Sequence, residues 1–177
     1  MSNNWLQRGE ILIGSERQER LKSAHILVVG LGGVGSWAAE MLCRAGVGEF
    51  TIIDADTVDV TNINRQMPAL STTVGKPKCS VVAERMRAIN PEVKITTGEF
   101  FVNGENIPEL LDKGGYSFVV DAIDTLEPKA ALIKGCWERG IRIISSMGAG
   151  AKCNLADIRT GNLWKTEQRV HIHSRVQ

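Results

Sequence analysis

A glycine-rich segment, GLGGVG at residues 30–35, directly follows the apolar run HILVV at residues 25–29 and precedes a stretch with helical periodicity. An uninterrupted apolar run of this kind is typical of a strand buried within a parallel sheet. Gly30, Gly32 and Gly35 satisfy the spacing G-x-G-x-x-G. Glycine permits the tight turn and lets backbone N–H groups approach a phosphate at a helix N-terminus. The segment therefore predicts a nucleotide-binding strand–helix unit, without choosing between nucleotides.

Strand-like and helix-like segments alternate along the rest of the chain. The predicted strands are residues 25–29, 50–53, 93–97, 117–120 and 141–145. The predicted helices are residues 17–23, 36–44 (with apolar Trp37, Met41 and Leu42 near every third or fourth place), 76–90, 108–111 and 128–139. The alternation predicts an α/β fold with a Rossmann-like, doubly wound, mainly parallel sheet and helices on both faces. Ligands in such sheets bind outside the carboxyl ends of the strands.

Acidic residues follow the second predicted strand. Asp54 ends this strand, where a carboxylate can accept hydrogen bonds from both ribose hydroxyls, and this placement fits NAD and ATP equally. Asp56 and Asp59 lie further into the polar loop and are more typical of solvated loop acids. We expect Asp54 to be the carboxylate that contacts a nucleotide ribose.

A further polar set favours ATP over NAD. Its members also follow strands or begin a helix: Asn62, Asn64, Arg65, Gln66, Lys78 and Asp124. Hydride transfer needs none of these charges, and any one of them alone would suggest a solvated surface. Adenylation needs cations and Mg²⁺, because the substrate carboxylate attacks the α-phosphorus and a charged pyrophosphate leaves. The chain has no G-x-x-x-x-G-K-[ST] motif, which argues against a P-loop ATPase.

The bulk properties narrow the setting. The 177 residues suit a single domain, and the formal net charge of +1 indicates no global attraction to nucleic acid, so a tRNA would need a local patch. The four cysteines form no C-x-x-C pair, and scattered thiols suit a reducing compartment. We expect Cys79 to be a half-buried helical thiol rather than a nucleophile, and His171 and His173 to be tail residues. With neither a signal peptide nor an apolar run long enough for a span, the chain is expected to be cytoplasmic.

The combined motifs resemble those of the ubiquitin-activating-enzyme superfamily of adenylating proteins. The resemblance covers roughly residues 5–151 and rests on three segments: VVGLGGVGSWAAEMLCRAGVGEFTIIDADTVDVTNINRQ, VGKPK and VVDAIDT. It implies ATP and Mg²⁺ as cofactors, with Asp124 handling the metal. The implied nucleotide-binding residues are Gly30, Gly32, Gly33, Gly35, Asp54, Asp56, Thr61, Asn62, Asn64, Arg65, Lys78, Asp124 and Thr125. The implied catalytic residues are Arg8, Arg65, Lys78 and Asp124.

Within this superfamily, GVGSWAAE and SSMGAGAK look most like the tRNA threonylcarbamoyladenosine dehydratases. That likeness implies ATP-dependent activation of the threonylcarbamoyl carboxylate on a tRNA adenosine, then cyclisation with loss of water. It also implies a homodimer in which Arg8 enters the partner's site, and it leaves room for a sulfur-relay protein partner. The closest alternative is an adenylyltransferase for a ubiquitin-like sulfur carrier of the molybdopterin or thiamine type. Such enzymes commonly carry paired C-x-x-C zinc ligands and Asn after the metal-binding Asp, where this chain has Thr125.

The resemblance fades after about Thr166, while the family domain runs further. We therefore expect residues 1–160 to form an ATP-binding adenylating domain, incomplete at its C-terminus, and residues 161–177 an irregular tail, poorly ordered from Lys165 onward. A truncated nucleotide-binding module without turnover is a further alternative. An NAD-dependent oxidoreductase is disfavoured by Arg65, Lys78 and Asp124.

Overall fold

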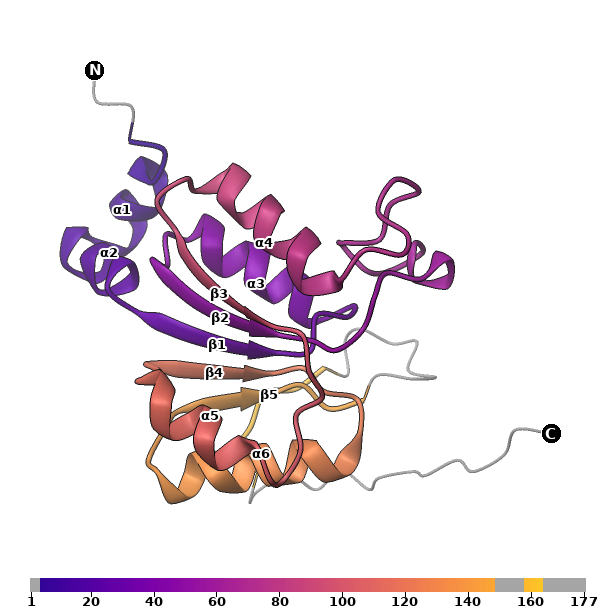
Figure 1. Ribbon diagram of the computed structural model, residues 1–177. Helices are drawn as coiled ribbons and strands as arrows, with labels where there is room; N and C mark the ends of the chain where they lie inside the picture. Colours follow the sequence, from indigo (N-terminus) through magenta and orange to yellow (C-terminus); the bar gives the residue numbers. More distant parts are fainter. Residues whose placement is uncertain (1–3, 149–157, 164–177) are drawn as a thin grey trace. The chain divides into compact units, whose positions relative to one another are not determined.

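Five short parallel strands form the centre of the fold. The computed structural model describes residues 4–148 and 158–163. Its strands are β1 (His25–Val29), β2 (Glu49–Ile53), β3 (Lys94–Gly98), β4 (Phe118–Asp121) and β5 (Ile143–Ser145). They pair in the order β3-β2-β1-β4-β5 (Figure 1). The chain starts in the middle of the sheet, extends it to one side and then to the other, which is the predicted doubly wound arrangement.

Helices cover both faces of the sheet (Figure 1). They are α3 (Gly35–Arg44) and α4 (Lys78–Ile89) on one face, and α5 (Ile107–Gly114) and α6 (Leu126–Glu138) on the other. Alternate residues of β1 enter two separate cores, Ile26 and Val28 on the first face and Leu27 and Val29 on the second. Burial on both faces explains why this strand is apolar without alternation. The predicted Rossmann-like α/β class is confirmed.

The strand register brings the strand ends together. Val29 pairs with Ile53 and with Asp121, and Ile53 pairs with Gly98. The loops that follow these strands therefore begin at one edge of the sheet, which we call the carboxyl edge. This edge is where a doubly wound sheet binds ligands.

The buried side of α3 differs from the side that its large apolar residues indicate. Trp37 and Met41 are about half exposed, and only Leu42 packs partly against the core. The fully buried apolar residues of the helix are Ala39 and Cys43. Small side chains let α3 lie close to the sheet and to α4, so the larger ones are displaced toward solvent.

Two helices precede the sheet where one was predicted. These are α1 (Gln7–Ile13) and α2 (Ser15–Lys22), joined at Gly14, whose φ of 85° suits glycine. The α2 side chain of Gln18 is buried, and its Nε2 donates a 2.9 Å hydrogen bond to the carbonyl of Ala45. Because Ala45 lies just before β2 begins, the N-terminal helices pack at the amino edge of the sheet, opposite the carboxyl edge (Figure 1).

Residues 1–147 form one compact unit and residues 148–177 a second. Of the second unit, the structure describes residue 148 and residues 158–163. The predictions about His171, His173 and the order of the chain from Lys165 onward concern residues outside the described ranges, and the division at residue 160 stays a prediction. Among the described helices, none has the length and apolar character needed to cross a membrane.

Candidate functional site

Two glycines of the loop at residues 30–35, here called the glycine loop, are required by the fold itself. Gly30 has a φ of 88°, and a Cβ there would lie 2.7 Å from the carbonyl oxygen of Ala122. A Cβ on Gly35 would lie 1.8 Å from the carbonyl oxygen of Gly30. Neither contact is physically possible, so the close approach of β1, α3 and the segment after β4 depends on these two residues.

The other two glycines are not required by any contact with the described residues. A Cβ on Gly32 would lie 3.7 Å from Gln66 Nε2, and a Cβ on Gly33 would lie 3.8 Å from Arg65 Cγ, which are ordinary van der Waals distances. A Cβ on either residue would therefore fit without a clash, so glycine at both positions is consistent with a phosphate approaching the N-terminus of α3.

Asp54 fixes the glycine loop to the end of β2. Its Oδ2 accepts a hydrogen bond from the backbone N–H of Leu31 at 2.6 Å, and its Oδ1 accepts one from Asp56 at 2.8 Å. Each carboxylate oxygen keeps a second lone pair, so both can still accept from a ribose hydroxyl. The predicted contact of Asp54 with a ribose stays a prediction.

Thr61 and Asn62 build the loop in which they lie. Asp59 accepts from both the N–H and the hydroxyl of Thr61, and Asn62 Oδ1 accepts from the N–H of Asp59 at 3.1 Å. These bonds close the short helix η1 (Val60–Asn62), and the two from Thr61, its hydroxyl first, lower the pKa of the exposed Asp59 carboxyl. Asp59 is therefore a helix cap, with a structural role beyond that of the solvated loop acid expected from the sequence.

Arg65 lies over the glycine loop, with its Cγ facing Gly33. Its Nη1 donates to the carbonyl of Thr61 at 3.0 Å and to Asn64 Oδ1 at 2.9 Å. These contacts orient the exposed guanidinium while its other N–H groups stay available for a phosphate. The indole Nε1 of Trp37 on α3 also donates a hydrogen bond to the Arg65 carbonyl at 3.4 Å.

Lys78, the first residue of α4, is 5% exposed, and its Nζ donates to Asp56 Oδ2 at 2.7 Å. Its backbone N–H also bonds to the Asp56 carbonyl. Asp56 is thus the counterion of a buried lysine, which corrects its interpretation as a solvated loop acid. A buried ammonium with one half-exposed partner can exchange that partner for a phosphate oxygen.

Asp124 and Thr125 follow β4 and are exposed, and Thr125 precedes α6 as its N-cap residue. Asp124 has no hydrogen bond or ion pair with any described residue. Within residues 4–148 and 158–163, no three His, Cys, Asp or Glu side chains form a metal-binding group. Mg²⁺ is commonly held by one or two carboxylates together with substrate phosphates, so a single carboxylate beside a phosphate site fits that ion.

The structure brings most predicted residues to the carboxyl edge, with one exception. Arg8 lies on α1, exposed at the amino edge. Sequence reasoning also missed a buried pair at the carboxyl edge, Asp121 at the end of β4 and Lys129 on α6, whose Nζ and Oδ2 are 2.7 Å apart. An aspartate within the apolar run FVVD was the available signal, because a buried carboxylate needs a partner.

The described thiols are inert. Cys43, Cys79 and Cys136 are free and fully buried, and burial raises the pKa of each to about 11. The Cys79 Sγ lies 3.4 Å from the carbonyl oxygens of Asp54 and Gly98. A protonated thiol is a poor nucleophile. Cys79 is thus not a nucleophile, as expected, although it is buried completely rather than by half.

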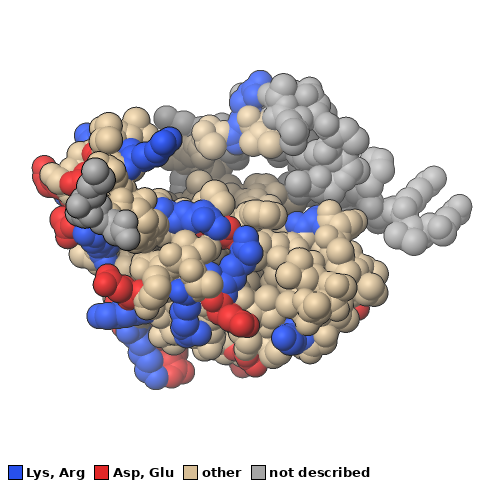
Figure 2. All heavy atoms as spheres, turned by 90° about the horizontal axis from the view of Figure 1, so that it is seen from above, with Lys and Arg blue, Asp and Glu red and all other residues tan. Residues whose placement is uncertain are grey.

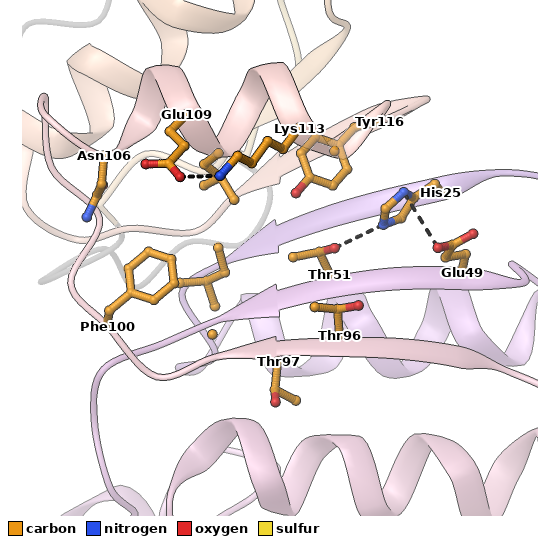
Figure 3. Close-up of a pocket in the computed structure, with 14 residues that line it drawn as sticks. His25, Glu49, Thr51, Thr96, Thr97, Phe100, Asn106, Glu109, Lys113 and Tyr116 are labelled. Atoms are coloured by element: carbon orange, nitrogen blue, oxygen red, sulfur yellow. Dashed lines mark hydrogen bonds and ion pairs between the residues drawn. The ribbon is translucent and has the colours of Figure 1, made fainter.

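A separate groove of about 700 Å³ lies between α5 and the adjoining face of β1–β3 (Figure 3). It is lined by His25, whose Nε2 lies 2.9 Å from Thr51 Oγ1 and whose ring meets Tyr116 edge-on at 4.8 Å between centroids. Its described lining includes none of the predicted site residues. The groove and the candidate nucleotide site are therefore different surfaces.

The fold and the carboxyl-edge residues together define a class: Rossmann-like nucleotide-binding domains whose glycine loop is accompanied by an arginine, a buried lysine and a free carboxylate. The sequence matches the ThiF family over residues 6–167, and the chain belongs to that family.

Named relatives agree with this membership. The chain is 46% identical over 171 residues to the tRNA threonylcarbamoyladenosine dehydratase of Escherichia coli (strain K12), covering 95% of this chain and 63% of the relative. A crystal structure of the E. coli tRNA N6-threonylcarbamoyladenosine dehydratase in complex with ATP superposes with a TM-score of 0.89 at 46% identity, covering 94% of this chain and 69% of that one.

A second group of relatives is more distant. The molybdopterin-synthase adenylyltransferase of Salmonella typhimurium (strain LT2) is 38% identical over 130 residues, covering 73% of this chain and 51% of the relative. The chain therefore spans between half and two thirds of the length of these curated relatives.

Proposed function

We propose that this chain binds ATP at the carboxyl edge and uses it to activate a carboxylate. Bound there, ATP supplies the α-phosphorus to which the carboxylate oxygen bonds as pyrophosphate leaves. The observation that carries the proposal is the placement of Arg65, Lys78 and Asp124 at the same edge of the sheet as Gly32 and Gly33. The ATP complex of the similar E. coli enzyme supports the choice of nucleotide.

Each group has a role that follows from its chemistry. Backbone N–H groups of the glycine loop and the ammonium of Lys78 approach phosphate oxygens, and Arg65 balances charge that develops as pyrophosphate departs. Asp54 and the polar loop residues hold the nucleoside: Asp56, Thr61, Asn62 and Asn64. Asp124 would hold Mg²⁺, with Thr125 beside it as a further contact, and Mg²⁺ neutralises charge on the departing phosphates.

The proposed substrate is threonylcarbamoyladenosine in tRNA, whose carboxylate, once activated, cyclises with loss of water. Similarity to the named dehydratases supports this substrate. The formal charge is only +1, and basic and acidic side chains are interspersed on the face seen in Figure 2. Recognition of tRNA would accordingly rest on local contacts near the site rather than on a broad basic field.

A homodimer is part of the proposal. The exposed Arg8 lies at the edge opposite the remaining site residues, so its proposed role requires the site of a partner subunit. We place this chemistry in the cytoplasm, because tRNA substrates occur there and thiols such as the buried Cys43 stay reduced there.

A sulfur-carrier adenylyltransferase is the second candidate, because the chain also resembles the molybdopterin-synthase enzyme, at the lower identity of 38%. It would act on a protein C-terminus, and a sulfur-relay protein would be its partner. A nucleotide-binding module without turnover is the third.

Pyrophosphate exchange into ATP tests the proposal. With tRNA carrying threonylcarbamoyladenosine we expect Mg²⁺-dependent exchange, and with unmodified tRNA or a ubiquitin-like sulfur carrier none. Exchange only with the sulfur carrier would replace the substrate assignment, and nucleotide binding without exchange would favour the module. Binding of NAD in place of ATP would refute the proposal as a whole.

A further inference from the structure

A buried ion pair stands beside the exposed Asp124. Asp121 ends β4 with no exposed surface, and Lys129, the fourth residue of α6, is 5% exposed. Lys129 Nζ donates to Asp121 Oδ2 at 2.7 Å. Burying two charges is costly unless their remaining hydrogen-bonding capacity is also satisfied.

The neighbouring strand supplies the remaining partners. Lys129 Nζ also donates to the Ser146 carbonyl at 2.9 Å and lies 3.3 Å from Ser145 Oγ, while the Ser145 hydroxyl donates to Asp121 Oδ2 at 2.5 Å. The backbone N–H of Ser146 bonds to the Asp121 carbonyl at 2.8 Å. The pair therefore ties together the ends of β4 and β5 and the first turn of α6.

Asp124 lies inside the turn that this pair closes. Asp121 Oδ1 accepts a hydrogen bond from the N–H of Ile123 at 3.0 Å, and Ala122 packs against Gly30 and Gly35 of the glycine loop. Asp124 itself bonds to no described residue, so its position depends on the backbone on either side of it. Both sides, Asp121 before it and Lys129 after it, belong to the same ion pair.

We propose that Lys129, acting through Asp121, is a positioning residue for Asp124, holding its turn against the glycine loop in the geometry that metal-bound ATP requires. This inference rests on the proposed function. Without the ammonium, the buried Asp121 carboxylate keeps no charged partner, and the link from the end of β4 to the first turn of α6 is lost. This loss loosens the bond of Asp121 to Ile123 and with it the placement of Asp124.

A double-mutant cycle tests the inference, using Lys129→Met and Asp124→Asn separately and together. ATP affinity is measured by calorimetry in Mg²⁺ and in EDTA. Each single variant should weaken MgATP binding by about tenfold, as loss of groups that orient a metal ligand does, and leave metal-free ATP binding unchanged. The double variant should bind no more weakly than Asp124→Asn alone, because Lys129 acts through Asp124. Lys129→Arg, which retains the charge, should keep most of the affinity.

Arg85→Met is the matched control, because it also removes a cation from a buried carboxylate, Glu40, but away from the carboxyl edge. It should lower stability without changing MgATP affinity. Should Lys129→Met fail to fold, Ser145→Ala gives a milder loss of the same network, read by MgATP affinity and by faster amide exchange at Ile123.

Four outcomes overturn the inference. Losses that add in the double variant, or unchanged MgATP affinity in Lys129→Met or its substitute Ser145→Ala, mean that the pair only stabilises the fold. These results leave the proposed function standing if Asp124→Asn still weakens binding. Absence of MgATP binding in the wild type, or undiminished binding in Asp124→Asn, overturns the site assignment and the inference with it.

Discussion

The four glycines of the loop at residues 30–35 divide into two kinds. Gly30 and Gly35 are fixed by contacts that no Cβ could make, while Gly32 and Gly33 could each carry a Cβ at an ordinary van der Waals distance from its neighbours. The sequence motif alone does not distinguish the glycines that packing requires from those that it does not, because all four positions simply read as glycine. Packing around the loop separates residues needed for folding from residues that leave space for a ligand.

Substitution of these glycines by alanine should separate folding from binding. Gly33→Ala should leave the free energy of unfolding nearly unchanged but weaken ATP binding by about 1–3 kcal/mol, because its Cβ enters the space proposed for phosphate. Gly35→Ala should lower the free energy of unfolding by about 1–3 kcal/mol or more. Urea unfolding and calorimetry measure both quantities. Equal loss of stability in the two variants would contradict this division.

Lys78 should matter for nucleotide binding far more than a lysine two residues away. Lys78→Met removes a buried ammonium and should weaken ATP binding by about 1.5–3 kcal/mol, the usual worth of a hydrogen bond to a charged group. Lys76→Met, at an exposed position just before α4, is the matched control and should bind normally. A similar loss in both variants would mean that only general charge is involved.

The positions of Asp54 and Lys78 at the carboxyl edge could be predicted from their places after a strand and at the start of a helix, while their contacts with nucleotide stay a prediction. Prediction failed where a partner distant in sequence decides the role. The counterion role of Asp56 depends on Lys78, and the burial of Asp121 depends on Lys129. The partner in each pair follows from packing rather than from a local pattern: α4 packs against the loop after β2 in the first pair, and α6 packs against the end of β4 in the second.

Between elements, α3 and α4 are joined by a buried carboxylate. The side chain of Glu40 on α3 is 3% exposed and bonds to Arg85 of α4 and to Arg44. The bond from Arg85, followed by that from Arg44, holds the pKa of Glu40 below its ordinary value. A carboxyl whose pKa is lowered on folding adds stability above its unfolded pKa, and this contribution is lost as the pH falls through the folded pKa.

Glu40→Gln should therefore lower the free energy of unfolding at pH 7 by about 1–3 kcal/mol and flatten its decline below about pH 4.3. Urea unfolding at several pH values measures both effects. Glu84→Gln, at an exposed position on α4, serves as the control and should follow the wild type. An unchanged acid slope in Glu40→Gln would show that other carboxylates govern it.

The strands were the elements best predicted, since apolar runs such as HILVV have no other place in a doubly wound fold. Helix α1 was missed because its sequence QRGEILI contains a glycine and ends in an apolar run that stays largely exposed. The exposure of Trp37 and Met41 was missed for a related reason. The periodicity of large apolar residues indicates that the face with Trp37 and Met41 is buried. The helix instead lies so close to the sheet that only small side chains fit on its buried face.

At the scale of the whole molecule, Arg8 and Asp124 lie at opposite edges of the sheet, so one subunit cannot bring them together. Arg8→Ala and Asp124→Ala should each be inactive alone, yet partly active when mixed. Random pairing makes about half the dimers mixed, each with one intact site, so about a quarter of the wild-type exchange activity should return. Pyrophosphate exchange measures the recovery, and mass spectrometry confirms that subunits have exchanged. No recovery despite exchange would assign Arg8 a role within its own subunit or none.

Because Cys43, Cys79 and Cys136 are buried in the folded domain, the rates at which they react with a thiol reagent report how often the domain opens. A reagent that attacks thiolates finds three groups that are both shielded and protonated, with pKa values of about 11. Labelling requires the chain to open and expose these thiols, so the labelling rate measures how often each part of the native structure opens. Cys153 lies outside the described residues and would be replaced by serine. Each remaining thiol then reports on a different element: Cys43 on α3, Cys79 on the N-terminal end of α4, and Cys136 on α6. A nucleotide that holds α3 and α4 together should slow the labelling of Cys43 and Cys79 more than the labelling of Cys136.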